Sequence, residues 1–176
     1  MPEFQDGRPR YLINFAIDLK PGEVPLLPST AALYKQRMSE FSKDDPIGKC
    51  QPVGIPRLDG FPAPFKIVQN PGLTIILYEY ETVFRQIFTD GRELPTDAQP
   101  TWMGYSVGKW KGDSFIVETS GFNDKSWLDV NGLPHSDALH ITERFTRINV
   151  GTLEIQITMS GPWRGVFATW LSGLKR

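Results

Sequence analysis

The segment TLEIQITM (152–159) restricts the fold more than any other part of the chain, because every second residue in it is apolar. A period of two is typical of a strand with one buried face. The preceding segment, ALHITERFTRI (138–148), is joined to it by the turn sequence Asn-Val-Gly. The two segments therefore predict an antiparallel hairpin.

Two further regions predict strands. GLTIILYEYETVFRQIF (72–88) is rich in β-branched and aromatic residues but exceeds a typical strand length, which predicts two strands with a bend near residues 81–82. GYSVGKWKGDSFIVETSGF (104–122) predicts a hairpin with strands over 104–110 and 114–119. Successive hairpins form an antiparallel meander, which removes exposed edges by closing into a barrel or pairing as a sandwich.

The N-terminal third has a different character. YLINFAI (11–17) predicts one short extended piece, and STAALYKQRMSEF (29–41) predicts a helix capped by Ser29 or Thr30. The apolar face of that helix comprises Tyr34, Met38 and Phe41. The segment 43–65 holds five prolines and predicts an extended, wrapping segment.

The chain of 176 residues is expected to form one domain, with the helix and proline-rich wrap in 1–65 and the strands in 66–176. Its 16 Gly and 15 Pro suit many short strands joined by turns. The predicted fold class is mainly β, a single antiparallel meander barrel of the lipocalin or calycin type with one N-terminal helix.

Composition excludes several kinds of partner and site. A formal net charge of −1 gives no electrostatic case for nucleic acid or an anionic membrane surface. The longest apolar run, LTIILYEY (73–80), is far below the roughly 20 residues of a membrane-spanning helix. The N-terminal MPEFQDGRPR lacks the apolar stretch of a secretory signal. With one cysteine, Cys50, the chain has no internal disulfide and no multi-cysteine metal or redox motif.

Both histidines lie in NGLPHSDALHITERF (131–145). On the predicted strand, His140 and Glu143 point to opposite faces, and no third ligand is near, so we expect no metal site and no cofactor. His135 lies in a loop, where functional groups tend to gather, although a surface histidine is the commoner outcome.

Two glutamates are candidate catalytic residues. Glu143 shares its predicted face with apolar Leu139, Ile141 and Phe145, and Glu79 shares a face with Ile75 and Leu77. One interpretation places both inside the barrel, where burial raises a carboxyl pKa and suits it to proton transfer, with Arg85 stabilising an anion. The other has Glu143 facing solvent or paired with Arg85, and Glu79 paired with Arg85 or Lys109. The predicted ligand-binding residues are Tyr78, Tyr80, Trp102, Tyr105, Phe115, Trp127 and His135, with core packing as the alternative for the aromatic residues.

Several motifs in order resemble one family. PFKIVQNPGLTIILYE, PTWMGYSVGKWKGDSFIVETSGFN and WLDVNGLPHSDALHITERFTR are similar to a family of exported bacterial hypothetical proteins, over about residues 11–160. The resemblance implies a periplasmic or extracytoplasmic location and supplies no chemistry. The positions that match the family pattern are Glu79, Arg85, Trp110, Asp113, Trp127, Ser136, Glu143 and Arg144. Since the histidine positions vary in that pattern, Glu143 with Arg144 is the pair of greater interest.

Three functions remain open from the sequence. The first is binding of a small apolar or aromatic molecule inside the barrel. The second is an acid–base isomerase, cyclase or lyase that uses the inward carboxylates. The third is an accessory structural subunit of a larger extracytoplasmic complex, which would dock on a protein partner through the C-terminal segment WRGVFATWL (163–171).

Overall fold

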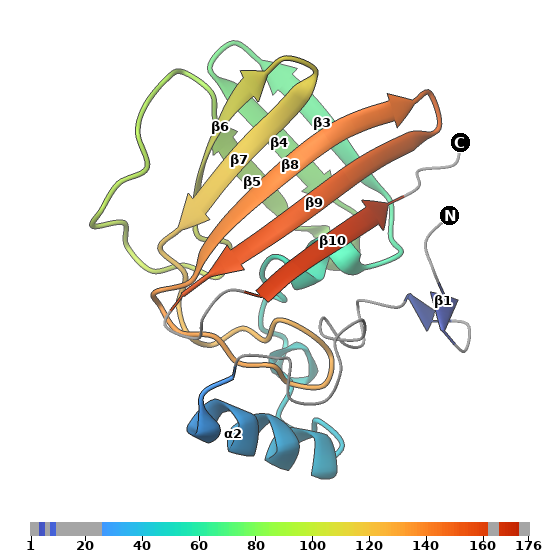
Figure 1. Cartoon of the computed structure of the whole chain (residues 1–176), viewed down its shortest axis with the longest axis vertical. Helices are drawn as coiled ribbons and strands as arrows, with labels where there is room; N and C mark the ends of the chain where they lie inside the picture. The colour runs from blue at the N-terminus through green and yellow to red at the C-terminus, as the bar shows by residue number, and fades with distance from the viewer. Residues whose placement is uncertain (1–3, 6–7, 10–25, 162–165, 173–176) are drawn as a thin grey trace.

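The computed structural model describes residues 4–5, 8–9, 26–161 and 166–172. Its main element is an eight-stranded sheet with the order β10-β9-β8-β7-β6-β5-β4-β3, which curls into a half-barrel (Figure 1). The strands are β3 (Phe65–Asn70), β4 (Leu73–Tyr78), β5 (Phe84–Phe88), β6 (Tyr105–Lys111), β7 (Ser114–Ser120), β8 (His140–Asn149), β9 (Thr152–Ser160) and β10 (Val166–Ser172). The two-residue strands β1 (Phe4–Gln5) and β2 (Arg8–Pro9) form a separate pair. The mainly β, barrel-like fold class is thus confirmed.

The sheet is a meander, since neighbouring strands follow each other in sequence, and all but one pair are antiparallel. The exception is β5 with β6, which pair in parallel through Ile87↔Ser106 and Phe88↔Val107. Parallel neighbours need a long return connection, and the segment 89–104 supplies one. The expectation of a purely antiparallel meander is wrong at this pair.

The predicted strands and their turns are confirmed. The bend between β4 and β5 is a short 3₁₀ turn, η3 (Tyr80–Thr82), in which Glu81 and Thr82 have φ of 56° and 53°. The hairpins β6–β7 and β8–β9 begin and end within two residues of the expected bounds. The expected extended piece at 11–17 lies outside the described residues.

The helix α2 (Pro28–Ser39) is where the sequence predicts a helix, but its ends differ. Leu27 occupies the N-cap position with no side-chain cap, and Pro28 begins the helix because its fixed φ suits the first turn. The expected cap at Ser29 or Thr30 is therefore wrong. Phe41 lies beyond the helix and is 95% exposed, so it belongs to no buried face.

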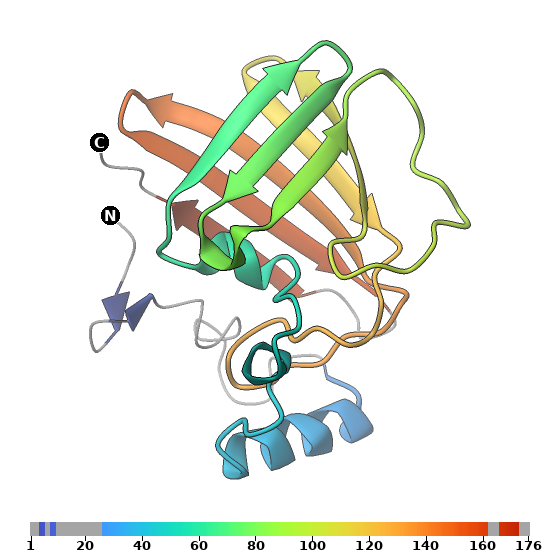
Figure 2. The ribbon, with the colours of Figure 1, turned by 180° about the vertical axis from the view of Figure 1, so that it is seen from behind.

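The proline-rich segment is not simply extended. It forms two 3₁₀ turns, η1 (Pro46–Lys49) and η2 (Arg57–Gly60). Residues 53–60, which we call the plug segment, are all buried, and they cross one end of the half-barrel (Figure 2). The expectation of an extended wrapping segment is wrong for these residues, because apolar Val53, Ile55 and Leu58 pack into the hollow of the sheet.

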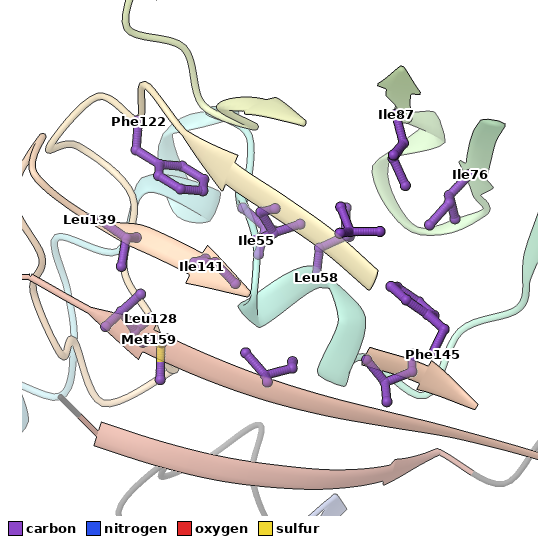
Figure 3. Close-up of a cluster of buried hydrophobic side chains, with 14 of the residues drawn as sticks. Ile55, Leu58, Ile76, Ile87, Phe122, Leu128, Leu139, Ile141, Phe145 and Met159 are labelled. Atoms are coloured by element: carbon purple, nitrogen blue, oxygen red, sulfur yellow. The ribbon is translucent and has the colours of Figure 1, made fainter. Parts of the chain in front are cut away.

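The core lies between the concave face of the sheet and the plug segment. Figure 3 shows Ile55 and Leu58 of the plug segment among side chains of the sheet, with Ile141 and Phe145 of β8 beside them. Each fully buried Ile or Leu side chain contributes roughly 1.5–3 kcal/mol to folding. The plug segment is thus part of the core that holds the sheet in its curved form.

Candidate functional site

A buried ion pair crosses the interior of the half-barrel. Arg85 of β5 and Glu143 of β8 have side chains that are 1% and 0% exposed. Arg85 Nη1 donates to Glu143 Oε1 at 2.9 Å, and Nη2 donates to Oε2 of the same carboxylate. The guanidinium also donates to Ser106 Oγ at 3.1 Å and to Thr119 Oγ1 at 2.9 Å. These hydrogen bonds join Arg85 of β5 to side chains of β6, β7 and β8.

Strand alternation brings these side chains together. On β8 the buried positions are every second residue, and Glu143 occupies one of them opposite Val117 of β7 and Ile157 of β9. On β5 the buried positions are Arg85 and Ile87. The two sequence interpretations of Glu143 therefore both hold in part, since its carboxylate is inside the half-barrel and paired with Arg85.

A second carboxyl group reaches this pair from the plug segment. Tyr78 Oη donates to Asp59 Oδ1 at 2.6 Å. Asp59 Oδ2 lies 3.9 Å from Arg85 Nη1, beyond hydrogen-bonding distance, and has no hydrogen-bond partner within the described part of the chain. This site thus brings together two carboxyl groups and one guanidinium.

The pKa values reflect this imbalance. Burial, followed by the charge of Glu143, raises the pKa of Asp59 to about 7, against the opposing effect of Arg85. Burial, followed by the nearby charge of Asp59, also raises the pKa of Tyr78 well above its ordinary value. A proton on Asp59 reduces the buried charge to that of the Arg85–Glu143 pair, which is balanced.

A cavity of about 510 Å³ opens at the other end of β4, toward the hairpin turns of β3–β4, β6–β7 and β8–β9. Its apolar walls include Ile76, Trp110, Phe115, Phe145 and Leu153. The rings of Trp110 and Phe115 are 5.2 Å apart, and those of Phe115 and Phe145 are 6.1 Å apart. We call this space the hairpin-end cavity.

Charged side chains also line the hairpin-end cavity. Lys66, Asp113 and Arg147 all belong to its lining and are exposed. Arg147 also donates to the carbonyl oxygens of Asn149 and Val150 in the β8–β9 turn, at 3.3 and 3.2 Å. The lining therefore combines aromatic side chains in the interior with charged, solvent-exposed side chains at the rim. It includes neither Asp59 nor Glu143.

Of the predicted catalytic residues, Glu79 is placed wrongly. The buried positions of β4 are Thr74, Ile76 and Tyr78, and Glu79 is exposed just beyond the strand. Asp59 is the second interior carboxyl group instead. Arg144 is exposed on the face of β8 opposite to Glu143, and the partner of Glu143 is Arg85.

The predicted ligand-binding residues are scattered, and only Phe115 lines the hairpin-end cavity. Tyr78 is buried against Asp59, Tyr80 stacks on Phe61 with ring centroids 3.9 Å apart, and Tyr105 stacks on Phe88. Trp102 and Trp127 line a polar groove beside α2. For Tyr78, Tyr80 and Trp127, the burial and packing correspond to the core alternative.

His135 is buried rather than on the surface. Its Nε2 is 2.7 Å from Ser126 Oγ, and its Nδ1 is 3.0 Å from the carbonyl oxygen of Ser136. A carbonyl oxygen only accepts, so Nδ1 carries the hydrogen and Nε2 accepts from Ser126. Burial lowers the pKa of His135. The expected opposite orientation of His140 and Glu143 is confirmed, since His140 is half-buried and Glu143 is on the interior face.

Sequence reasoning missed Asp59, Ser106 and Thr119. Ser106 and Thr119 face each other across β6 and β7, with hydroxyl oxygens 2.9 Å apart, and the alternation of β7 is a signal that could have placed Thr119 inside. No such signal exists for Asp59, because the apolar residues of the plug segment do not recur with the period of a strand or a helix. Among the described residues, no group of three or more His, Cys, Asp or Glu side chains is arranged to hold a metal ion.

The C-terminal segment is partly a strand. Residues 166–172 form β10, whose backbone pairs with β9 from Val166↔Met159 to Ser172↔Leu153. Residues 163–165 of the proposed docking segment lie outside the described residues. In the described part of the chain, no helix is long and apolar enough to cross a membrane.

Comparisons with known proteins add no assignment: no family model, curated protein or solved structure matches this chain.

Proposed function

We propose that the protein binds a small apolar or aromatic molecule in the hairpin-end cavity. The observation that carries this proposal is the cavity itself, about 510 Å³ with walls that include Trp110, Phe115 and Phe145. Sites for small molecules commonly measure roughly 300–1,000 Å³ and are lined by apolar and aromatic side chains. The charged rim would contact a polar end of the ligand.

Dye binding tests this function. The probe is N-phenyl-1-naphthylamine, an uncharged aromatic dye that fluoresces in apolar surroundings. We expect saturable binding, weakened about tenfold or more by Trp110→Ala, because burial of a large aromatic contact contributes roughly 1.5–3 kcal/mol. Phe84→Ala is the matched control, since Phe84 is similarly exposed (60% against 58% for Trp110) but does not line the cavity.

Absence of saturable binding would contradict the proposal, and so would equal losses in the two variants. Equal losses would show that the dye responds to exposed aromatic surface in general. Both variants remove an exposed ring, so neither is expected to disturb folding strongly.

Acid–base chemistry is a second candidate, favoured by the buried Asp59–Glu143 pair. Two carboxyl groups with different environments can divide the roles of acid and base. If this function holds, a ligand recovered with the protein will take up deuterium during incubation in D₂O. That uptake is expected to disappear in Glu143→Gln and is read by mass spectrometry of the ligand.

A further inference from the structure

Three hydrogen-bonded contacts among the described residues join the plug segment to its neighbours. Val53 N–H donates to Glu81 Oε2 at 3.0 Å. Arg57 donates to both carboxylate oxygens of Asp45, at 3.0 and 2.7 Å. The third contact is the Tyr78–Asp59 hydrogen bond. This third contact joins the segment to the buried site of the sheet, together with the longer approach of Asp59 Oδ2 to Arg85 Nη1 at 3.9 Å.

The titratable groups facing Asp59 come from three strands: Tyr78 of β4, Arg85 of β5 and Glu143 of β8. Four of the five N–H hydrogens of Arg85 are directed to Glu143, Ser106 and Thr119. Arg85 Nη1 lies 3.9 Å from Asp59 Oδ2, which is too far for a hydrogen bond. The carboxyl groups of Asp59 and Glu143 both approach Arg85 Nη1, at 3.9 Å from Asp59 Oδ2 and 2.9 Å from Glu143 Oε1, and the contact between the two carboxyl groups raises the pKa of Asp59. Two carboxylates only accept, so this contact is attractive only when one of them carries a proton.

A proton on Asp59 Oδ2 would satisfy the contact between Asp59 and Glu143. Oδ2 is buried and otherwise lacks a partner among the described residues. As a hydroxyl it would donate to Glu143, while Oδ1 accepts from Tyr78. As a carboxylate it would leave a second negative charge in a site with one guanidinium, and burial makes an uncompensated charge costly.

We propose that a proton on Asp59 holds the plug segment in the half-barrel, and that loss of this proton releases the segment and opens the interior to solvent. The effect of pH follows from linkage. When the segment is released, Asp59 is in water and its pKa returns to about 3.8, whereas in the closed form it is about 7. Between these values the closed form binds more protons, so raising the pH favours the open form. The opening constant therefore rises up to about tenfold per pH unit from about pH 4 to pH 7 and is level above pH 7.

Hydrogen exchange measured by mass spectrometry tests the inference on the full chain. The readout is exchange in a peptide covering residues 53–61, corrected for intrinsic chemical rates and compared with a peptide from β8. From pH 5 to pH 8 we expect the opening of the plug peptide to rise by at least tenfold more than that of β8. In Asp59→Asn we expect no such rise, because the amide stays neutral and its N–H₂ donates to Glu143.

Asp45→Asn is the matched control. It weakens the Arg57 contact and loosens the plug segment at every pH, but the pH-dependent rise is expected to remain. A flat wild-type profile would overturn the proposal, and so would a rise that persists in Asp59→Asn. If Asp59→Asn fails to fold, carbon-detected NMR of the wild-type Asp59 carboxyl decides: a midpoint near 7 supports the proposal, and one near 4 overturns it.

Discussion

At the scale of single residues, the Arg85–Glu143 pair is the most constrained feature. Both side chains are removed from water, and Arg85 donates hydrogen bonds to side chains of β6, β7 and β8. A buried ion pair is weak evidence for stability in itself, but breaking one is costly because the surviving charge stays buried. The stability of the fold therefore depends on keeping both Arg85 and Glu143.

Replacing one partner should show that cost. Arg85→Met is expected to lower the free energy of unfolding by about 3–5 kcal/mol, because Glu143 is left buried and unpaired. The double variant Arg85→Met/Glu143→Leu should recover part of the loss. Urea unfolding at constant pH measures both.

The control for this experiment is Arg144→Ala, an exposed arginine on the same strand as Glu143, which should change stability by about 0.5 kcal/mol or less. If Arg85→Met resembled Arg144→Ala, water would have to reach Glu143, and the description of a sealed pair would be wrong.

At the scale of elements, the strands pack closely on one another, whereas the helix α2 is held by a few specific contacts. The face of β6 toward the interior includes Gly108, and a Cβ there would lie 2.5 Å from Phe115 Cζ and 2.8 Å from Ile87 Cγ2. Phe115 thus occupies the space that Gly108 leaves, and this places its ring in the wall of the hairpin-end cavity.

Gly108→Ala is therefore expected to destabilise the protein by about 1–3 kcal/mol through overpacking. It should also change dye affinity, because Phe115 must move. Gly48→Ala is the control, since a Cβ at Gly48 meets no atom within 4 Å. Thermal unfolding compares the two, and equal melting temperatures would contradict the close packing of β6 on β7.

None of the residues of α2 is buried, so the helix is held by specific contacts. Arg37 Nη1 donates to the Gly132 carbonyl oxygen at 2.8 Å, and its guanidinium lies 4.5 Å above the Trp127 ring. Tyr34 Oη donates to Asp129 Oδ2 at 3.0 Å.

Arg37→Ala should release α2 while the sheet stays folded, because no residue of α2 is buried in the core and Tyr34 only packs against it. We expect faster proteolysis within 28–39 and unchanged hydrogen exchange in β8 and β9. Lys35→Ala, on the exposed side of the same helix, should leave the cleavage rate as in the wild type. Equal cleavage of the two variants would mean that Arg37 does not anchor the helix.

At the scale of the whole molecule, two buried groups, Asp59 and His135, make the free energy of unfolding depend on pH in opposite directions between about pH 4 and pH 7. Asp59 has a raised pKa, so its contribution falls as pH rises from about 4 to about 7. His135 has a lowered pKa, so the native state resists the proton that the unfolded chain takes up near pH 6.5. The contribution of His135 is therefore full above about pH 6.5 and is lost as pH falls below it.

His135→Gln should remove the second effect. We expect the difference in unfolding free energy between wild type and variant to shrink as pH falls from 7 toward 5. In the wild type alone, protonation of the imidazole in the unfolded chain lowers the free energy of unfolding. Denaturant titrations at several pH values measure this difference. His140→Gln, at the half-buried histidine, is the control, and a constant difference for His135→Gln would contradict a buried neutral imidazole.

Some residues of the site were predictable and others were not. The face of Glu143 followed from alternation, because Leu139, Ile141 and Phe145 mark one side of β8 as apolar. Glu79 was misplaced because β4 carries apolar residues on both faces, so its hydrophobic pattern does not select the inward one. Asp59 lies among prolines in a segment without a period, and no local rule predicts that such a segment enters the core.

By itself the sequence determined where the strands and hairpin turns lie and that the protein is mainly β, because alternation and turn chemistry act between near neighbours. Only the tertiary structure decided that β5 and β6 pair in parallel, that residues 53–60 fill the half-barrel, and which charges meet inside it. Arg85 and Glu143 are 58 residues apart. Contacts over such separations depend on the curvature of the sheet and the register of its strands, which are set when the whole core packs.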